Sequence, residues 1–423
     1  MRLTRTAVAG LVTIGLALTT VTVVAPSAQA SPCNATGLVG GDFGSTGSSG
    51  SSDIGLGSLD FGSYHAGGKK PQMPLVKLTS GPSQTVSWVT GPRSPAKTDA
   101  RFSITSTDVG VPWDNGSGQV LMAFGDTWGR CQGAMVWRHN TMLRSNGDSD
   151  LSKGITFRDP QVGNIFSGAS VTPAHPTFAQ PMVNAVGVRN IEVGMIPTAG
   201  IAVNGVQYVS FMSIHNWGPP GRWVTNYSVL AASRDNGQHW AVDWNTARSN
   251  YELNIPGNSH FRTGQGRFQV SAFLRVGGWV YQYGTPNGRF GATFLSRVPA
   301  SQIADIDAYE YYSGGVNGGW SRDSSTAGRV VREPVSEMSV AYNDYLKKYV
   351  MLSAIGLDVV LRTSPAPTGP WSNPRVIVSG AQTGGLYAPY IHPRSHGQML
   401  YFVASRWEDY NVMLLRTDLS KVR

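Results

Sequence analysis

The sequence predicts an all-β fold, and two features of its composition support that prediction. The 423 residues include 51 glycines and 10% aromatic residues, whereas only 14% are charged. Glycine suits tight turns and aromatic residues favour pleated strands, so this mixture predicts many short strands joined by turns. A hydrophobic content of 41% is too high for a disordered chain. An all-helical fold is also excluded.

Internal repeats are the third observation, and they specify the architecture. Five segments share an apolar strand, a tight turn and a second apolar strand that ends in small, polar or aromatic residues: 106–129, 196–218, 269–285, 337–353 and 387–407. Asn204-Gly205 and Gly277-Gly278 are turns that match the twist of antiparallel strands. Each unit has roughly 65 residues available, which is enough for a four-stranded blade. We therefore predict a five-bladed β-propeller over residues 75–423.

The chain begins with a predicted signal peptide, residues 1–30. Arg2 and Arg5 precede a long apolar stretch, and Ala28-Gln29-Ala30 resembles a cleavage site. No basic stop-transfer segment follows, so we expect a secreted protein, extracellular or in the cell envelope, without stable membrane insertion. Residues 31–74, rich in glycine and serine, are predicted to be a loosely packed segment that leads into the propeller.

Cysteine usage and charge limit the partners. Cys33 and Cys131 are the two cysteines, and both follow the predicted cleavage site, so a disulfide between them is expected in an oxidising compartment. Two cysteines cannot build a structural zinc site, and the eight histidines have no metal-ligand spacing, so we predict no metal and no cofactor. The net charge of +9 is spread along the chain without a basic run, which argues against a nucleic-acid partner. A monomer is expected.

One short motif is predicted to be structural. Ser233, Asp235, Gly237 and Trp240 fit Ser-x-Asp-x-Gly-x-x-Trp, the Asp box that recurs in sialidase-type propellers. In such a motif the aspartate caps a tight turn and the tryptophan packs between strands.

Aligning the five units on their turns identifies candidate catalytic acids. The inner positions that correspond are Asp108, Thr198, Ser271 (or Gln269), Glu337 and Tyr387. Because the second strand of each unit returns to the start of the first, Asp126 should lie beside Asp108 at the same mouth of the ring. Several carboxylates at one concave mouth are what a glycoside hydrolase needs, since one protonates the leaving oxygen and another attacks or activates water.

The roles follow from this alignment. Asp108 is predicted to act as base or nucleophile, Glu337 as general acid, and Asp126 to tune and orient them, with Glu192 as a possible additional acid. Aromatic and polar side chains near the mouth are predicted to bind sugar: Trp128, Thr198, His215, Trp217, Asn226, Tyr387, His392 and Trp407.

Each acid also has a structural interpretation. Asp108 and Asp126 could bond to their own turns, and Glu337 could pair with an arginine. Two other functions therefore stay open: a non-catalytic carbohydrate-binding propeller, and another glycosidase such as a sialidase-like enzyme. The Asp box suggests the latter, but no arginine cluster for a substrate carboxylate lies at the inner positions.

Several of these segments together resemble a known family. Thr107-Asp108-Val-Gly, Phe124-Gly-Asp126-Thr-Trp, Ile196-Pro-Thr-Ala-Gly-Ile and the closing Tyr401-Phe-Val-Ala-Ser-Arg-Trp are similar to the secreted bacterial family long called domain of unknown function 4185. The resemblance covers roughly residues 75–420. That family corresponds to glycoside hydrolase family 183, whose characterised members are endo-acting D-arabinofuranosidases. The resemblance implies a five-bladed propeller that cleaves the D-arabinan of mycobacterial arabinogalactan and lipoarabinomannan, with Asp108 as a catalytic residue.

Overall fold

The computed structural model describes residues 71–146, 150–315 and 317–422. The all-β prediction is confirmed, because strands dominate this part of the chain and its two α-helices are short, α1 at Thr98–Phe102 and α2 at Gly380–Thr383. Within the described ranges, no helix is long and apolar enough to cross a membrane. The predicted signal peptide, most of residues 31–74 and Cys33 lie outside the described residues, so the leader and the Cys33–Cys131 disulfide stay predictions.

The first half of the described chain forms three antiparallel sheets. Two are small and come from the first unit of the sequence, and the third has four long strands. Their strands, in sheet order, are β2 (Ser106–Thr107), β5 (Thr127–Cys131) and β6 (Ala134–Arg138); β3 (Val111–Asp114), β4 (Val120–Phe124) and β7 (Thr141–Arg144); and β8 (Gly194–Val203), β9 (Val206–Trp217), β10 (Trp223–Ser233) and β11 (Ala241–Ser249).

The second half forms three further sheets. The first of them continues past its third strand into short additional strands. The strands are β12 (Val270–Val276), β13 (Trp279–Thr285), β14 (Gly291–Pro299), β15 (Glu310–Tyr312), β16 (Trp320–Ser321) and β17 (Arg329–Val335); β18 (Met338–Asn343), β19 (Lys348–Ile355), β20 (Asp358–Ser364) and β21 (Arg375–Val378); and β22 (Leu386–Ile391), β23 (Met399–Arg406), β24 (Asn411–Asp418) and β1 (Ser83–Trp88).

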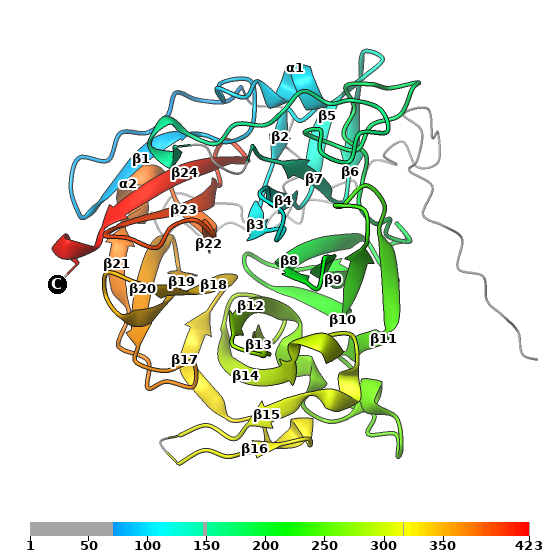
Figure 1. Ribbon diagram of the computed structural model, residues 1–423, viewed down its shortest axis with the longest axis vertical. Helices are drawn as coiled ribbons and strands as arrows, with labels where there is room; N and C mark the ends of the chain where they lie inside the picture. Colours follow the sequence, from blue (N-terminus) through cyan, green and yellow to red (C-terminus); the bar gives the residue numbers. More distant parts are fainter. Residues whose placement is uncertain (1–70, 147–149, 316, 423) are drawn as a thin grey trace, which may run out of the picture.

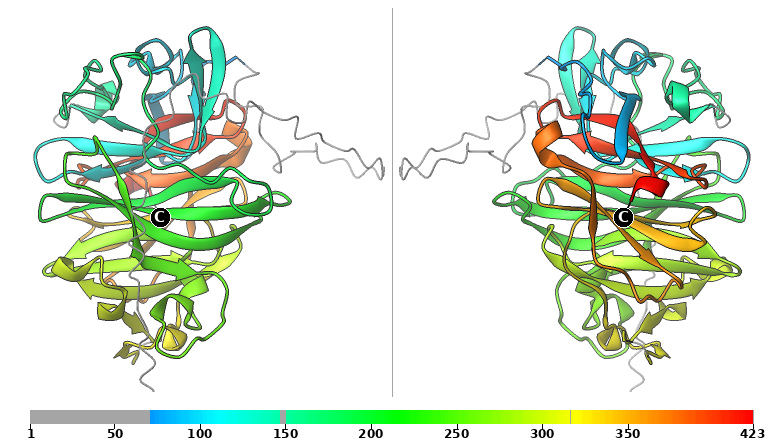
Figure 2. Two further views of the ribbon diagram at one scale, coloured as in Figure 1. Left: turned by 90° about the vertical axis from the view of Figure 1, so that its right-hand side faces the viewer. Right: turned by 90° about the vertical axis from the view of Figure 1, so that its left-hand side faces the viewer.

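The sheets are arranged around a common axis. The strands β3, β8, β12, β18 and β22 lie nearest that axis in Figure 1, and each contacts the next, with β22 contacting β3 to close the ring. Side views show the long strands running roughly along the axis (Figure 2). Since these inner strands all belong to the first halves of the predicted units, their starts are expected to meet at one mouth of the ring.

Pairing between the two ends of the described chain closes the last sheet. β1 runs antiparallel to β24, with Ser83 opposite Thr417 and their hydroxyls 2.6 Å apart. This pairing joins segments more than 300 residues apart, so an early strand completes a sheet built by the end of the chain.

The predicted hairpin turns form where the sequence placed them. Asn204 and Gly205 have φ of 51° and 79° and join β8 to β9, and Gly277 (φ 58°) lies between β12 and β13. Positive φ at these positions gives the turn the twist of the flanking strands, which explains the Asn-Gly and Gly-Gly pairs.

The hydrophobic core lies between neighbouring sheets of the ring. Phe124 of β4, Phe211 of β9 and Leu414 of β24 are fully buried members of one large cluster. Leu361 and Phe402 belong to another, between the β18–β21 and β22–β24 sheets. Burial of each such side chain stabilises the fold by about 1.5–3 kcal/mol, and the contacts hold the sheets at fixed angles around the axis.

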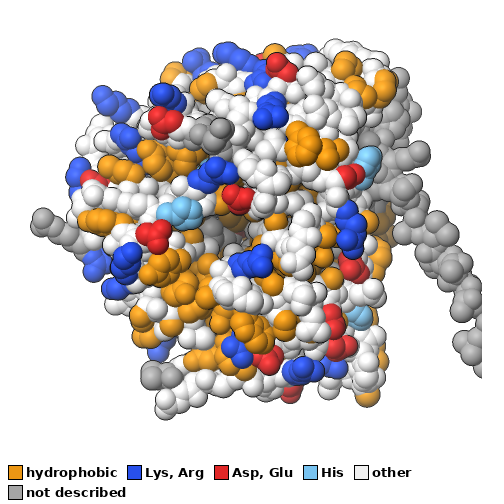
Figure 3. All heavy atoms as spheres, viewed as in Figure 1, with side chains coloured by type: hydrophobic (Ala, Val, Ile, Leu, Met, Phe, Trp, Pro, Cys, Tyr) orange, Lys and Arg blue, Asp and Glu red, His pale blue; other side chains and the backbone are white. Residues whose placement is uncertain are grey.

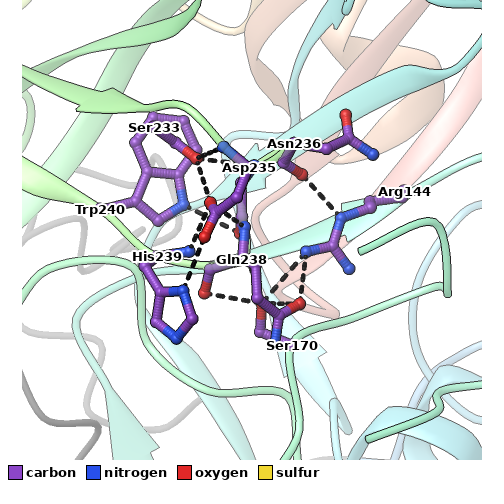
Figure 4. Close-up of polar contacts among 9 residues, drawn as sticks. Arg144, Ser170, Ser233, Asp235, Asn236, Gln238, His239 and Trp240 are labelled. Atoms are coloured by element: carbon purple, nitrogen blue, oxygen red, sulfur yellow. Dashed lines mark hydrogen bonds and ion pairs between the residues drawn. The ribbon is translucent and has the colours of Figure 1, made fainter. Parts of the chain in front are cut away.

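The Asp box is structural, as predicted (Figure 4). Asp235 Oδ1 accepts from the backbone N–H groups of Gln238 (3.1 Å) and His239 (2.9 Å) and from Ser233 Oγ (2.8 Å). Trp240 is 8% exposed and packs edge-on against Trp113 of β3, with the ring centroids 6.4 Å apart. The motif therefore caps a turn and joins two neighbouring sheets.

Candidate active site

Strained backbone marks the mouth of the ring at which the inner strands start. Val109 has φ of 68°, Ala388 has φ of 50° and Tyr410 has φ of 50°. Left-handed φ values are unfavourable for non-glycine residues, above all for a β-branched valine, and such residues cluster at functional sites. Val109 follows Asp108 and Ala388 follows Tyr387, so the strain lies directly beside two predicted site residues.

Asp108 lies at this mouth between β2 and β3. Its Oδ2 accepts a 3.0 Å hydrogen bond from the hydroxyl of Tyr387, and the Tyr410 hydroxyl also donates to it. The Oδ1 atom is buried without a hydrogen-bond partner among the described residues. Burial raises the pKa of Asp108 from an ordinary 3.8 to about 7, with a further rise from the charge of Glu337, against the lowering effect of the tyrosine hydroxyls and Arg289.

Glu337 lies just before β18 and is paired with an arginine. Arg289 donates from Nη2 to Glu337 Oε1 at 2.6 Å and from Nε to Oε2 at 3.0 Å, which is a bidentate geometry. The Glu337 side chain is only 5% exposed. Burial alone would lower the pKa of Arg289, but Glu337 and the other charges nearby raise it overall. This two-point contact fixes the orientation of the Glu337 side chain.

Aromatic rings surround Arg289. Its guanidinium carbon lies 5.1 Å from the ring centroid of Trp223, 5.1 Å from that of Tyr387 and 4.9 Å from that of Trp407. Tyr387 and Trp407 stack on each other with centroids 4.0 Å apart. Cation–π contacts of this kind hold a guanidinium in place, so the ion pair with Glu337 is positioned from several sides.

Asp126 adds a third carboxyl group, between β4 and β5. Its Oδ1 accepts from Trp137 Nε1 at 3.0 Å. Burial raises the pKa of Asp126 well above its usual range, and the nearby charge of Asp108 raises it further. The backbone N–H of Gly125 donates to the carbonyl of Asp108 at 3.1 Å, which places Asp126 directly beside Asp108. Burial and the neighbouring carboxyl thus both favour the protonated form of Asp126.

The structure therefore brings three of the predicted acids into one group. They come from the first unit (Asp108 and Asp126) and the fourth unit (Glu337). Asp108 is electrostatically coupled to both of the others. Among the predicted sugar contacts, Tyr387 and Trp407 belong to this group, and Trp128 lies beside it, with its ring 6.3 Å from that of Trp137.

Other predicted residues lie elsewhere. Thr198 is 1% exposed and donates from Oγ1 to the carbonyl of Ser210 in β9 (3.2 Å), so its side chain is not available to a substrate in this structure. His392 is 3% exposed and lies just beyond the far end of β22 from Tyr387, where its Nδ1 accepts from the N–H of Arg394. The alignment of units placed Thr198 in an inner strand, but it did not give the direction or burial of its side chain.

Glu192 belongs to a separate polar group that includes two more predicted residues. Its Oε2 accepts from Ser213 Oγ (3.0 Å) and the Tyr227 hydroxyl (2.8 Å), and its Oε1 accepts from a backbone N–H. His215 Nδ1 lies 3.2 Å from Asn226 Oδ1. Burial and the charge of Glu192 raise the pKa of Tyr227. These bonds tie the segment before β8 to β9 and β10, which explains the burial of Glu192 without catalysis.

Sequence reasoning missed four residues of the central group: Arg289, Trp137, Trp223 and Tyr410. Arg289 carried a usable signal, because it follows the second strand of the third unit, just as Asp126 follows the second strand of the first unit. We considered only acids and tryptophans at such positions. The other three reach the site through outer strands and loops, for which the repeat pattern makes no prediction.

Figure 3 shows the charged and hydrophobic side chains on one face of the molecule. There, lysine and arginine side chains are interspersed with acidic and polar ones. This mixed surface offers no continuous basic track on that side. Chemically, the central group offers a carboxyl whose pKa burial raises to about 7, a second whose pKa is raised well above its usual range, and a third paired with an arginine, all among aromatic rings. Such a set suits acid–base chemistry on a neutral ligand.

Comparison with known proteins adds the following findings. The model of a family described as "Domain of unknown function (DUF4185)" matches residues 93–416. Notoamide biosynthesis cluster protein J of Aspergillus sp. (strain MF297-2) is 29% identical over 321 residues, covering 73% of this chain and 81% of that protein. Protein J' of Aspergillus versicolor is 30% identical over 320 residues, covering 73% and 82%.

Solved structures are similar at a greater distance. A putative hydrolase from Bacteroides ovatus has a TM-score of 0.47 and 13% identity, covering 75% of this chain and 87% of its own. An α-L-arabinofuranosidase from Podospora anserina has a TM-score of 0.42 and 10% identity, covering 80% and 98%. A Bacillus subtilis arabinanase has a TM-score of 0.38 and 12% identity, covering 74% and 94%.

Proposed function

The chain belongs to the DUF4185 family, and from that premise we propose that it is a glycoside hydrolase, an endo-D-arabinofuranosidase. Its proposed substrate is the D-arabinan of mycobacterial-type arabinogalactan and lipoarabinomannan. The observation that carries the hydrolase proposal is the convergence of Asp108, Asp126 and Glu337 among aromatic rings, with the pKa values of the two aspartates raised by burial. The arabinan part rests on the family resemblance of the sequence.

The proposal includes a five-bladed propeller. The closed ring of contacts through β3, β8, β12, β18 and β22 supports this count. A count of five requires that the two three-stranded sheets of the first unit form a single blade. It also requires that β1 completes the fifth blade, together with β22, β23 and β24. In such a ring the axis leads to the mouth where the acids lie.

We assign Asp108 as the base or nucleophile at the anomeric carbon. A base works best when its pKa lies near the working pH, and the pKa of Asp108 is about 7. The hydroxyl of Tyr387 donates to Oδ2, and Oδ1 is buried without a hydrogen-bond partner among the described residues.

We assign Asp126 as the proton donor. Burial and the charge of Asp108 raise its pKa well above the usual range, which favours the protonated form that a donor to the leaving oxygen needs. The sequence alone favoured Glu337 for this role, but both Glu337 oxygens accept from Arg289, and a proton there would break the ion pair. Glu337 is then the group that keeps Arg289 in place.

The first test of the function is a digest of purified mycobacterial arabinogalactan with sizing of the products. Endo-cleavage predicts a rapid loss of long chains and the appearance of arabino-oligosaccharides of several lengths. Release of single sugars alone would contradict endo-action, and an unchanged polymer would contradict hydrolysis. The control is the Asp108→Asn variant, checked for folding by circular dichroism.

A second test separates the two candidate proton donors. A good aryl leaving group needs little protonation, so a variant that lacks the acid should recover activity on an aryl D-arabinofuranoside oligomer. We expect Asp126→Asn to be rescued by this substrate and Glu337→Gln to lose at least ~10² in turnover on both substrates. Rescue of Glu337→Gln in place of Asp126→Asn would return the donor role to Glu337.

One observation favours a second candidate function, a non-catalytic carbohydrate-binding propeller. The buried ion pair between Glu337 and Arg289 uses a carboxylate for structure, and the remaining acids and aromatic rings could bind sugar hydroxyls and C–H faces without cleavage. Tight binding of arabinan with no shortened fragments after prolonged incubation would select this function.

We also propose that the protein is secreted as a monomer after removal of residues 1–30. The support is the sequence of the leader. N-terminal sequencing of protein recovered from the culture medium would give Ser31 as the first residue, and a retained leader would contradict the proposal.

A further inference from the structure

We propose that the β9–β10 tip and the β13–β14 loop form a second sugar-binding subsite outside the group of acids. This subsite consists of Trp217, Arg222 and Phe290, and its occupant is the part of the polysaccharide chain that extends beyond the bond being cleaved. The inference rests on the proposed function, and it adds Arg222 and Phe290, which neither the repeats nor the acids identified, to the predicted Trp217.

The two loops are held together as one unit. The backbone N–H of Arg289 donates to the carbonyl of Gly221 at 2.9 Å, and Asn287 Nδ2 donates to the carbonyl of Trp223 at 2.6 Å. Within the β9–β10 tip, the N–H of Gly218 donates to the carbonyl of Arg222 at 2.9 Å. A platform supported this way loses little conformational entropy when a ligand binds, which favours affinity.

Exposed aromatic surface lies on both loops. Phe290 is 50% exposed and Trp217 is 40% exposed. The guanidinium carbon of the exposed Arg222 lies 4.5 Å from the ring centroid of Phe290. Flat apolar rings suit the C–H faces of sugars, and guanidinium N–H groups donate to sugar hydroxyls. The three side chains thus combine stacking surface with directional donors, which a merely structural apolar contact does not need.

A glycine allows the close contact of the two loops. Gly221 has φ of +70°, and a Cβ on it would meet Phe290 Cε2 at 3.2 Å. A larger residue there would strain the turn and push the phenylalanine ring away. Gly221 therefore lets the ring lie directly on the β9–β10 tip.

The subsite is continuous with the acids. Trp217 packs edge-on against Trp223 with centroids 6.0 Å apart, and Trp223 contacts Arg289, the partner of Glu337. Phe290 directly follows Arg289 in the chain, so its Cα lies about 3.8 Å from that of the ion-paired residue. A chain bound at the acids can therefore reach Phe290 and Trp217 within a short run of sugars. Longer substrates should then be cleaved more efficiently than the shortest ones.

The test compares Phe290→Ala and Arg222→Ala with Phe166→Ala, a matched control. Phe166 is also exposed, at 46%. Its loop is held to the Asp box, because Asn236 Nδ2 donates to the carbonyl of Ile165 and Gln119 Nε2 donates to that of Phe166. For each folded variant, kcat/KM is measured on D-arabinan and on the shortest oligosaccharide that the wild type cleaves. We expect kcat/KM on D-arabinan, divided by kcat/KM on the short oligosaccharide, to fall about tenfold for Phe290→Ala and severalfold for Arg222→Ala. For Phe166→Ala this ratio should change by less than twofold.

Binding measurements separate failure of this inference from failure of the function. In the Asp108→Asn background, affinity for oligosaccharides of increasing length is measured with and without Phe290→Ala. If wild type cleaves arabinan but Phe290→Ala leaves both the length dependence and the ratio unchanged, the subsite is wrong and the function stands. If wild type neither binds nor cleaves arabinan, the function and the subsite are both overturned.

Discussion

The Asp box and the mouth of the ring each contain an aspartate, but the hydrogen bonds to the two side chains differ, and so do the directions of their pKa shifts. At the Asp box, Asp235 accepts from two backbone N–H groups, a serine hydroxyl and the His239 ring, and these bonds lower its pKa in spite of burial (Figure 4). At the mouth, Asp108 has an oxygen without a partner, and burial raises its pKa to about 7. The aspartate with full local hydrogen bonding thus has a lowered pKa, and the aspartate with an oxygen lacking a partner among the described residues has a raised one.

The two arginines differ in the same sense. Arg144 is fully buried and donates to four uncharged acceptors: the carbonyls of Asn236 and Ser167, Ser170 Oγ and Gln238 Oε1. Figure 4 labels Asn236, Ser170 and Gln238 around Arg144. Burial lowers its pKa to about 10. Arg289 instead pairs with Glu337, and its pKa is raised. The first arginine fastens a loop, whereas the second holds a carboxylate in place at the site.

The comparison teaches that burial of a charge does not by itself identify a site. The Asp box also has positive φ, at Asn236 (58°), but asparagine tolerates that conformation. The mouth differs because a β-branched residue, Val109, adopts it there, and because several carboxyls share the mouth. Both features lower stability, so they persist only where the surrounding sheets hold them.

The largest expected effect separates the two aspartates by activity. Asp108→Asn should lower turnover on arabinan by at least ~10², because it removes the base and leaves the shape unchanged. Asp235→Asn should leave turnover per folded molecule within about twofold, while weakening the turn by about 1 kcal/mol. Product release and thermal unfolding are measured on both variants. Equal losses of activity would mean that the distinction between the two regions is false.

A smaller effect separates the two arginines. Arg289→Lys keeps the charge but loses the two-pronged contact with Glu337, so turnover should fall about tenfold. Arg144→Lys cannot satisfy all four acceptors, so we expect a loss of about 2 kcal/mol in unfolding free energy with turnover per folded molecule unchanged. Denaturant titration and initial rates give both quantities. Loss of activity in Arg144→Lys without loss of stability would contradict its structural role.

The smallest effect is a change in how stability depends on pH. The folded pKa of Asp108, about 7, lies above its ordinary 3.8, so ionisation costs stability progressively from about pH 4 to pH 7, and the full cost persists at higher pH. Asn does not ionise, so the melting temperature of Asp108→Asn relative to wild type should rise by about 3 °C between pH 4 and pH 8.

Asp235 provides the opposite sign as a control. Its pKa is lowered, so its contribution is present above the unfolded pKa and is lost as pH falls through the folded one. Asp235→Asn should therefore be less stable than wild type near neutral pH, and the deficit should shrink in acid. If the stability of both variants relative to wild type changed with pH in the same direction, the two carboxyls would not differ in environment.

Local patterns in the sequence were sufficient for much of the architecture. The Asn204-Gly205 and Gly277-Gly278 turns, the strands that flank them and the Asp box each depend on residues close together in the chain. Their chemistry is local, because a positive φ or a capping oxygen acts within a few residues. For the same reason the repeat pattern indicated that Asp108, Asp126 and Glu337 start or end strands at one mouth.

What only the tertiary structure decided was the state of each side chain. The pairing of Glu337 with Arg289, the contact of Trp137 with Asp126 and the burial of Thr198 and His392 join residues from different sheets or loops. Burial, hydrogen-bond partners and pKa depend on which atoms surround a group in space. Those neighbours are set by how the sheets pack around the ring, and no short stretch of sequence contains that information.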